Sequence, residues 1–457
     1  MTFTRILASM ALAACSLPLC AQNAEPYPST YQRLASKPLM ITNATILTGT
    51  GDRLDDASLL MADGKIVAVS ADSIRNTVDA EVLDAEGRWV TPGVIDVHSH
   101  LGVYASPGLA AHSDGNEMTA PVTAQVWAEH SIWPQDPGFS RALAGGVTSM
   151  QIMPGSANLV GGRTVTVKNV PAVSYQEMKF PGAPQGLKMA CGENPKRFYG
   201  EQKITPSTRM GNVAGYRAQW VEAQKYIADW AAYEMALAAG GETPVQPVRD
   251  LRLDTLAAVL QGEILVHMHC YRADEMMTVI DMSDEFDYQV SAFHHGVETY
   301  KIADELAERG ICGALWADWW GFKAEAYDGI QEDIAIVDRP EGSCAIVHSD
   351  SSEGIQRLNQ EAAKAMTRGN AAGMSITPAR AITWVTANPA KSLGIIEQTG
   401  TLEAGKMADV VIWNGNPFSV YAKADQVFID GALVFDRANL DLQPVSDFEL
   451  GQLQGVQ

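Results

Sequence analysis

The chain has 457 residues, of which 46% are hydrophobic and 19% charged, and its formal net charge at pH 7 is −21. This length suits a (β/α)₈ barrel with one small additional domain. The strong acidity argues against nucleic acids and anionic membrane surfaces as partners.

The first 21 residues have the organisation of an export signal. Arg5 provides a positive charge, an apolar stretch ending in small residues follows, and polar residues come next. We expect cleavage after Ala21, which gives a mature net charge of −22 because the +1 of Arg5 is subtracted from −21. Lipidation at Cys15 is a less favoured alternative, and Pro18 and the short stretch disfavour a membrane anchor. The sequence thus predicts a periplasmic or secreted protein without a transmembrane segment after signal removal.

Two β-rich regions flank the centre of the chain, at residues 38–91 and 400–436. Their alternating apolar residues and Asp-Gly or Glu-Gly turns predict hairpins. Neither region is a self-sufficient sheet, so we expect one small β-sandwich domain built from both chain ends. Residues 437–457 then form a C-terminal tail.

Between these regions, residues 92–399 alternate short apolar runs with helical stretches. This alternation predicts an α/β fold with parallel strands and right-handed crossovers, and eight such units close into a TIM-like barrel. Residues 164–169 are either one of the eight strands or part of a hairpin. The other seven expected strands are GVIDVHSH, GVTSMQIM, GLKMAC, EILVHMH, QVSAFHH, GICGALW and SCAIVHSD.

Four cysteines lie outside the signal: Cys191, Cys270, Cys312 and Cys344. They are widely spaced, form no CxxC motif, and lie in or beside strand-like runs. Buried free thiols are therefore the favoured interpretation. One disulfide stays open as an alternative, because an exported protein meets oxidising conditions.

Ionisable side chains gather at the carboxyl ends of the predicted strands, which form the active-site face of a barrel. Four strands end in histidine or aspartate, a pattern that single core histidines do not explain. Imidazole and carboxylate ligands suit Zn²⁺, with Fe²⁺ or Mn²⁺ as alternatives. The residues are His98, His100, Lys188, His267, His269, His294, His295, His348 and Asp350.

Several motifs resemble landmarks of the amidohydrolase superfamily, in its imidazolonepropionase-like branch. The resemblance covers residues 38–436, and it is specific for the superfamily but not for a substrate. The motifs are TPGVIDVHSHLG, GVTSMQIMPGSANLVGG, HCYRADE, HHGVETYKIADEL, HSDS, ITWVTANPAKSLGI and GTLEAGKMADVVIWNGNP.

The resemblance implies which of these residues bind metal. The implied ligands of one or two divalent ions are His98, His100, His269, His295 and Asp350. His267 and His348 lie two residues lower on their strands, about 6–7 Å deeper, and are interpreted as supporting residues. His294 is expected to face the opposite side of its strand and to be structural.

Asp350 is expected to have two functions, because a metal-bound carboxylate can also carry protons. Metal binding lowers the pKa of water toward about 7, and Asp350 would accept the water proton and pass it to the leaving nitrogen. The alternative is that Asp350 caps the next helix, but Ser351 and Ser352 could cap equally well.

Lys188 lies in an apolar run, where an unpaired ammonium is costly. A lysine whose pKa falls on burial can add CO₂ and become an anionic carbamate. The resemblance implies that such a carbamate bridges two metals. Glu193 is an alternative carboxylate ligand, because ACGENPKR replaces the expected glycine-rich turn. A lysine paired with Asp350, or one reaching solvent, is a further alternative.

Substrate-binding candidates lie in the loops after the strands. Tyr271 and Arg272 follow the His269 strand, and Lys196 and Arg197 follow the Lys188 strand. An arginine there could hold a carboxylate, although exposed loop charges are equally expected. The aromatic segment 316–328 is interpreted as a pocket wall, a lid or a subunit contact.

These features predict a metal-dependent hydrolase of amide, dipeptide or cyclic-amide C–N bonds in a small-molecule substrate. The alternatives are a lactone or phosphoester hydrolase on the same centre and a non-catalytic metal-binding barrel. A complete His-x-His, His, His, Asp set favours catalysis over the last alternative. Zn²⁺ is the favoured metal, and a homo-oligomer stays open.

Overall fold

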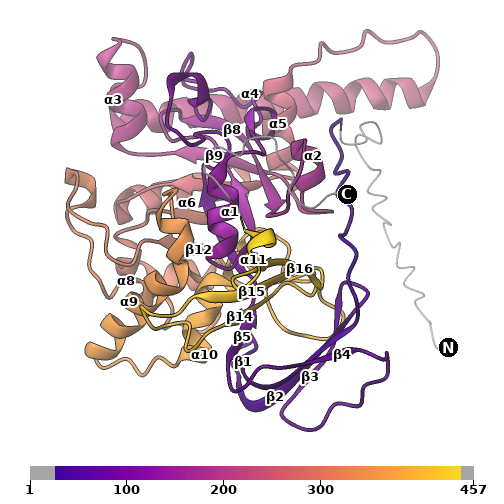
Figure 1. The fold of residues 1–457 in the computed structure, drawn as a ribbon. Helices are drawn as coiled ribbons and strands as arrows, with labels where there is room; N and C mark the ends of the chain where they lie inside the picture. The colour runs from indigo at the N-terminus through magenta and orange to yellow at the C-terminus, as the bar shows by residue number, and fades with distance from the viewer. Residues whose placement is uncertain (1–25, 444–457) are drawn as a thin grey trace, which may run out of the picture.

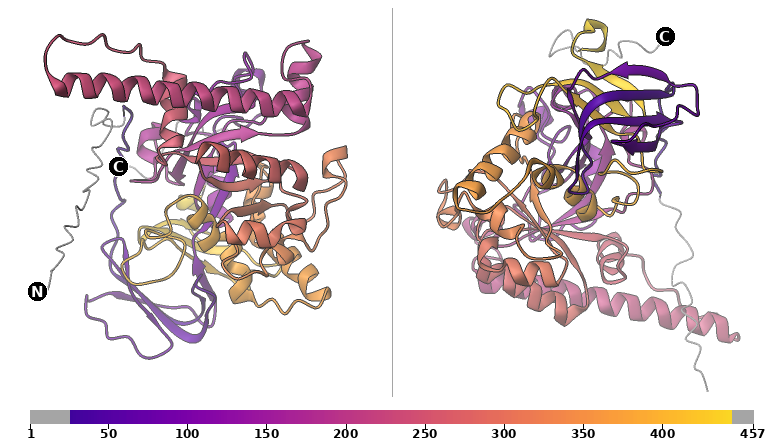
Figure 2. Two further views of the ribbon diagram at one scale, coloured as in Figure 1. Left: turned by 180° about the vertical axis from the view of Figure 1, so that it is seen from behind. Right: turned by 90° about the horizontal axis from the view of Figure 1, so that it is seen from below.

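The computed structural model describes residues 26–443 (Figures 1 and 2). The predicted export signal, with Cys15, and the end of the predicted tail lie outside these residues. Within 26–443, no helix combines the length and apolarity needed to cross a lipid bilayer.

Both chain ends contribute strands to one eight-stranded sheet, in the order β16-β15-β14-β5-β1-β2-β3, with β4 paired to β1. Asp63-Gly64 and Asp430-Gly431 all have positive φ, as the tight β2–β3 and β15–β16 hairpins require. Antiparallel pairing of β5 with β14 joins the two ends. The strands are β1 (Leu39–Leu47), β2 (Arg53–Ala62), β3 (Lys65–Ser70), β4 (Glu81–Asp84), β5 (Trp89–Pro92), β14 (Val410–Trp413), β15 (Ala424–Ile429) and β16 (Ala432–Asp436).

The second eight-stranded sheet forms the barrel, in the order β13-β12-β11-β10-β9-β8-β7-β6. Just beyond β13, Asp350 N donates to His98 O at 3.0 Å and links the two edges of the sheet. The predicted TIM-like barrel is confirmed. Its strands are β6 (Val94–Ser99), β7 (Val147–Ile152), β8 (Val160–Lys168), β9 (Gly186–Ala190), β10 (Leu265–His269), β11 (Val290–His294), β12 (Cys312–Leu315) and β13 (Ala345–Val347).

Strand β8 departs from the expected parallel arrangement, because it pairs antiparallel with both β7 and β9. The connection from β7 to β8 spans only residues 153–159, too few for the crossover that a parallel strand needs. The segment 164–169 therefore belongs both to a hairpin and to the barrel sheet.

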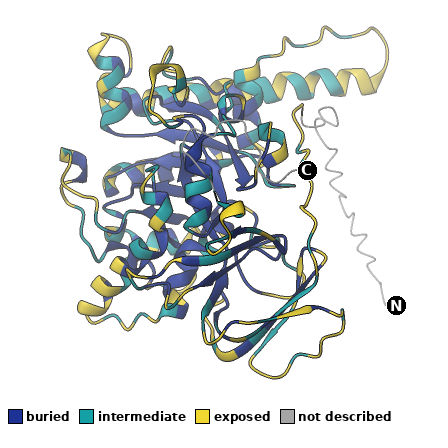
Figure 3. Ribbon diagram, in the orientation of Figure 1, coloured by how far each residue is buried: buried dark blue, intermediate teal, exposed yellow. Residues whose placement is uncertain are grey.

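Helices follow most barrel strands and cover their outer faces (Figure 3). Local sequence explains their starts: Asp136 caps α1 at Gly138 N, with Pro137 in the first turn, and Asp250 caps α5. The long helix α4 extends beyond the barrel (Figure 2). The helices are α1 (Pro137–Ala144), α2 (Tyr175–Met178), α3 (Glu193–Glu201), α4 (Arg209–Ala239), α5 (Leu251–Leu260), α6 (Ala273–Phe286), α7 (Ala303–Glu308), α8 (Asp333–Val337), α9 (Leu358–Ala371), α10 (Pro378–Ala381) and α11 (Ala387–Ser392).

The four cysteines form two disulfides, Cys191–Cys270 and Cys312–Cys344, so the prediction of free thiols is wrong. The reason is strand register. Ala190 lies opposite His269 in the β9–β10 pair, so Cys191 and Cys270 follow as neighbours. The second pair joins the amino ends of β12 and β13. Sequence separations of 79 and 32 residues conceal both pairings.

A buried ionic cluster joins the barrel to the β domain. Lys168, at the end of β8, places Nζ 3.2 Å from Asp409 Oδ1 and 3.0 Å from Asp430 Oδ2. Thr399 Oγ1 donates to Asp409 at 2.9 Å, and the Tyr31 hydroxyl donates to Asp430 at 2.5 Å. Every charge in this cluster therefore has partners.

Candidate metal centre and active site

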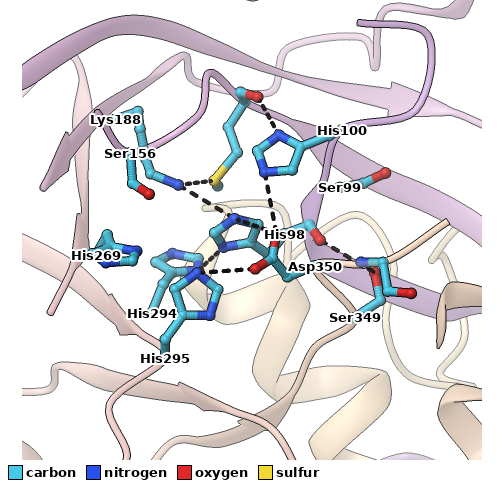
Figure 4. Close-up of polar contacts among 12 residues, drawn as sticks. His98, Ser99, His100, Ser156, Lys188, His269, His294, His295, Ser349 and Asp350 are labelled. Carbon is cyan, nitrogen blue, oxygen red and sulfur yellow. Dashed lines mark hydrogen bonds and ion pairs between the residues drawn. The ribbon is translucent and has the colours of Figure 1, made fainter. Parts of the chain in front are cut away.

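The carboxyl ends of four barrel strands bring the five predicted ligands together (Figure 4). His98 in β6, His100 just after it, His295 after β11 and Asp350 after β13 contribute to two groups of closely spaced ligand atoms. His269, at the end of β10, belongs to neither group and lies beside His295, with ring centroids 4.9 Å apart. Three of these side chains are almost completely buried. The side chains of His100 and Asp350 are 19% and 25% exposed, so the centre opens to solvent on their side.

Three imidazoles converge on the Asp350 carboxylate. Its Oδ1 lies 3.2 Å from His100 Nε2 and 3.5 Å from His98 Nε2. Its Oδ2 lies 3.6 Å from His295 Nε2. Burial alone would raise the pKa of Asp350, but the hydrogen bond and charge of His100, with His348 and Lys188, lower it below the usual value. Asp350 is therefore ionised at neutral pH.

Asp350 and His295 both have left-handed backbones, with φ of 47° and 58°. This conformation costs a residue other than glycine about 1–3 kcal/mol, and such strain concentrates at functional sites. Ser351 Oγ accepts a hydrogen bond from Gly354 N at 2.9 Å and so caps the following turn. The Asp350 side chain is therefore not needed as the cap.

The prediction that His294 faces away from the site is wrong. Its Nδ1 lies 3.0 Å from His98 Nδ1, and its Nε2 lies 3.0 Å from His267 Nδ1. The left-handed backbone of His295 breaks strand alternation, so two successive histidines point inward. Three buried imidazoles thus form a chain from the centre toward the barrel floor.

Lys188 is 1% exposed, and its Nζ lies 3.3 Å from His98 Nε2 and 3.1 Å from Met153 Sδ. Within residues 26–443, no ion pair within 4 Å includes Lys188, so it is not paired with Asp350. Its burial also excludes the alternative that it reaches solvent. Desolvation lowers its pKa from 10.5 to about 7, although the charge of Asp350 opposes this. A large fraction of this amine is therefore neutral at pH 7.

The two supporting histidines differ. His267 is buried and contacts His294, as a deeper residue should. The expected hydrogen bond of His348 near Asp350 is not observed, and neither of its ring nitrogens has a partner. Instead, nitrogens of His348, His98 and His295 lie within 4.8 Å of one another. His348 is thus placed like a further ligand.

The donor set fits a divalent cation. Buried nitrogens without partners are costly, and here they include His269 Nδ1, His295 Nδ1 and both of His348. A second ligand group combines His98, His100 and Asp350. Burial, with the charge of Lys188, also lowers the pKa of His269 far below its usual value. It therefore stays neutral, which is the form that binds metals.

The other predicted residues are less central. Glu193 lies 3.6 Å from Lys323, and Arg197 is exposed on α3. Arg272 is 41% exposed and pairs with Asp274 at 2.9 Å. Tyr271 does reach the site, because its buried ring lies 4.8 Å from that of His269.

Sequence reasoning missed two neighbours of the predicted ligands besides His294, namely Met153 and Asn194. Met153 O accepts from His100 Nδ1 at 2.8 Å, which leaves Nε2 free for a metal. Asn194 Nδ2 lies 3.3 Å from His269 Nε2, and the Trp316 ring stacks on His295. Met153 carried a signal, since it is the last residue of the predicted strand GVTSMQIM, and Trp316 begins the aromatic segment 316–328, for which a pocket wall was one interpretation.

Comparison with known proteins decides the family. The amidohydrolase family model matches residues 89–434. The chain belongs to the amidohydrolase family. It is 33% identical over 434 residues to amidohydrolase tasK of Hapsidospora irregularis, covering 88% of this chain but only 43% of that protein. It is 23% identical over 380 residues to the imidazolonepropionase of Mesorhizobium japonicum, covering 79% of this chain and 87% of that protein.

A solved structure supports the same assignment. The amidohydrolase from Thermotoga maritima MSB8 has a TM-score of 0.79 and 35% identity, covering 87% of this chain and all of that one. Membership places the chain among hydrolases that act on C–N bonds.

Proposed function

We propose that this protein is an exported, metal-dependent amidohydrolase that cleaves an amide, dipeptide or cyclic-amide C–N bond in a small substrate. The convergence of three imidazole nitrogens on an ionised Asp350 carries the proposal. A barrel that only bound metal would not need a proton carrier at the solvent-facing side of the centre.

The residues that would hold one or two ions are His98, His100, His269, His295 and Asp350. This mixture of nitrogen and oxygen ligands suits Zn²⁺. A bound cation supplies Lewis acidity, which lowers the pKa of water and polarises a carbonyl.

Asp350 carries the proton during hydrolysis. With its lowered pKa it is a carboxylate at neutral pH and can accept a proton from the attacking water. His100 keeps the carboxylate oriented at 3.2 Å. The proton then passes to the leaving nitrogen as the C–N bond breaks, which returns Asp350 to its ionised form.

Lys188 serves as a carbamate ligand. Its neutral amine adds to the carbon of CO₂, an N–C bond forms, and one proton is released to water. Burial disfavours the ammonium form of Lys188 and so favours the amine that reacts, and a bound cation would offset the cost of burying the carbamate anion. Glu193 is a weaker candidate than Lys188 for this ligand position, because its carboxylate already lies 3.6 Å from Lys323 Nζ.

Export agrees with the disulfides. Cysteine pairs persist in oxidising compartments, and residues 1–21 have the charge and apolar pattern of an export signal. A mature amino terminus at Gln22, found in the periplasm or medium, would support export, whereas a lipid on Cys15 would replace it with a membrane-anchored form.

The test is hydrolysis of a pooled library of amides, dipeptides, cyclic amides, lactones and phosphoesters. We expect turnover of C–N substrates, loss of turnover after chelation and recovery on adding Zn²⁺. Asp350→Asn should lower kcat by about 10²- to 10⁴-fold, because it removes the proton carrier without changing shape.

Glu353→Gln is the matched control, since it also converts a carboxylate into an amide on the same loop but at an exposed position. Its kcat should stay within twofold of wild type. Equal turnover by wild type and Asp350→Asn would overturn the mechanism, and turnover confined to lactones or phosphoesters would overturn the substrate class.

A further inference from the structure

The segment between β12 and α8 places aromatic rings against the metal centre. The Trp316 ring stacks on His295 with centroids 4.3 Å apart and planes at 23°. Trp316 Nε1 donates to Ser349 O at 3.2 Å, which fixes the indole between the ends of two strands. Trp319 then stacks on Trp316 at 5.3 Å. A continuous ring stack therefore leads from a ligand histidine outward.

A second row of rings completes this surface. Tyr271 lies nearly parallel to His295 at 5.9 Å. Phe322 meets Tyr271 edge-on at 6.3 Å and Trp316 edge-on at 5.6 Å. We call Tyr271, Trp316, Trp319 and Phe322 the aromatic wall.

Exposure increases along the aromatic wall. Tyr271 is 4% exposed, whereas Trp319 and Phe322 are 43% and 57% exposed. Clustered aromatic rings left in water mark a binding surface, because covering them removes apolar area from solvent.

The charges beside the aromatic wall are already paired. Lys323 Nζ lies 4.1 Å from the Tyr271 ring centre, but it donates to Asn194 Oδ1 at 2.9 Å and faces Glu193 at 3.6 Å. Glu325 forms an ion pair with Arg209. The wall therefore offers π faces and edges rather than a free charge.

We propose that the aromatic wall binds an uncharged aryl group of the substrate beside the scissile C–N bond. The inference rests on the proposed hydrolysis and adds a substrate class to it. Ring stacking on Trp319 and Phe322 would hold the aryl group while the neighbouring carbonyl lies at the metal centre. The aryl group belongs to either the acyl or the amine side of the bond.

The experiment compares substrates that differ only in the ring. Phenylacetyl and hexanoyl amides of glycine test the acyl side, and anilides and hexylamides of acetate test the amine side. The wild type should prefer the aryl member of at least one pair by about tenfold in kcat/KM. Trp319→Ala and Phe322→Ala should raise KM for that aryl substrate about 3- to 10-fold, with little change in kcat or for the alkyl partner.

Tyr327→Ala is the matched control. Tyr327 belongs to the same segment and is 75% exposed, but no ring contact found in the described residues joins it to the aromatic wall. Its kinetic constants should equal those of the wild type. Equal preference for aryl and alkyl partners in both pairs, or equal effects of all three substitutions, would overturn the proposal.

A binding measurement separates this proposal from hydrolysis itself. Phenylacetamide, acetanilide and hexanamide are titrated into Asp350→Asn, with and without Trp319→Ala, by calorimetry. Tighter binding of an aryl amide that weakens with Trp319→Ala supports the aromatic wall even if no library member is hydrolysed. Indistinguishable binding of the three amides overturns it even if hydrolysis is found.

Discussion

Two buried lysines, Lys188 and Lys168, show how the same residue type is used differently in two regions of the barrel. Both are 1% exposed or less and lie on neighbouring strands, β9 and β8. Lys168 has two carboxylates within 3.2 Å. Lys188 has an imidazole nitrogen and a thioether sulfur instead, neither of them anionic.

The difference separates stability from function. A buried charge with complete partners holds two parts of the chain together, here the barrel and the β domain. A buried amine without an anionic partner is a cost to the fold. Such a cost persists where the group has a chemical use, and at Lys188 that use is the proposed carbamate.

The largest expected effect follows from removing the cation of the buried cluster formed by Lys168, Asp409 and Asp430. Lys168→Met leaves Asp409 and Asp430 buried without their cation, so the free energy of unfolding should fall by about 3–5 kcal/mol. Urea unfolding measures this change. The kcat of the molecules that remain folded should match the wild type, and a loss of kcat without a loss of stability would erase the distinction between the two lysines.

The two disulfides allow a similar comparison between stability and function, because one lies at the carboxyl ends of barrel strands and the other at their amino ends. Replacing either pair by serine should lower the free energy of unfolding by about 2–4 kcal/mol. Cys191–Cys270 directly follows the strands of Lys188 and His269, so its loss should also lower kcat. Cys312–Cys344 lies at the amino ends of β12 and β13, so its loss should leave kcat unchanged.

Unfolding curves and kcat values for both double serine variants check this expectation. Equal effects on kcat would show that the first disulfide acts only through global stability.

Sequence reasoning found the residues that converge at the candidate centre because strand-end polarity is a local signal. His98, His100 and Asp350 each follow an apolar run, and the resemblance selected His269 and His295. Sequence reasoning selected Lys188, which lies in the apolar run GLKMAC, but assigned no role to Lys168, whose run TVTVKN also contains two threonines and an asparagine. The carboxylate of Asp409 is 241 residues from Lys168, and nothing local announces that contact.

The remaining misses have the same cause. Disulfide pairing depends on register between strands, and the inward position of His294 depends on the left-handed backbone of its neighbour. Strand register is set by tertiary packing, and the left-handed backbone at His295 interrupts the strand alternation on which the prediction for His294 rested.

Replacing Lys188 should give the reverse of the Lys168→Met result, namely a loss of activity without a loss of stability. Lys188→Met removes the proposed ligand, so kcat/KM should fall at least about 100-fold, the scale of losing a group that tunes a metal site. The metal-free variant should not be less stable than the metal-free wild type.

The pH dependence gives this stability prediction its sign. Lys188 has a pKa of about 7 when folded and 10.5 as its usual value, so the unfolded chain binds more protons between these values. Burying the Lys188 ammonium therefore destabilises the wild type fully below about pH 7, and this destabilisation decreases progressively toward pH 10.5. The stability gained by Lys188→Met should therefore be greatest below pH 7 and should vanish near pH 10.5. A gain that is constant with pH would show that Lys188 is already paired.

The smallest expected effect concerns the imidazole chain behind the centre. If His98 offers Nε2 to a metal, its Nδ1 must carry the proton and donate to His294 Nδ1. His294 Nε2–H then donates to His267 Nδ1, so a single choice of tautomer at His98 fixes the other two. His294→Phe removes the acceptor while keeping a ring in the space, and metal affinity should fall about tenfold.

His294→Asn supplies the contrast, because its side-chain oxygen can accept the same hydrogen bond and should retain part of the affinity. Competition with a chromogenic zinc chelator measures both variants. Equal affinity in His294→Phe and wild type would mean that packing alone orients His98. In that case the imidazole chain would have no functional role, and the contrast with the Lys168 cluster would rest on Lys188 alone.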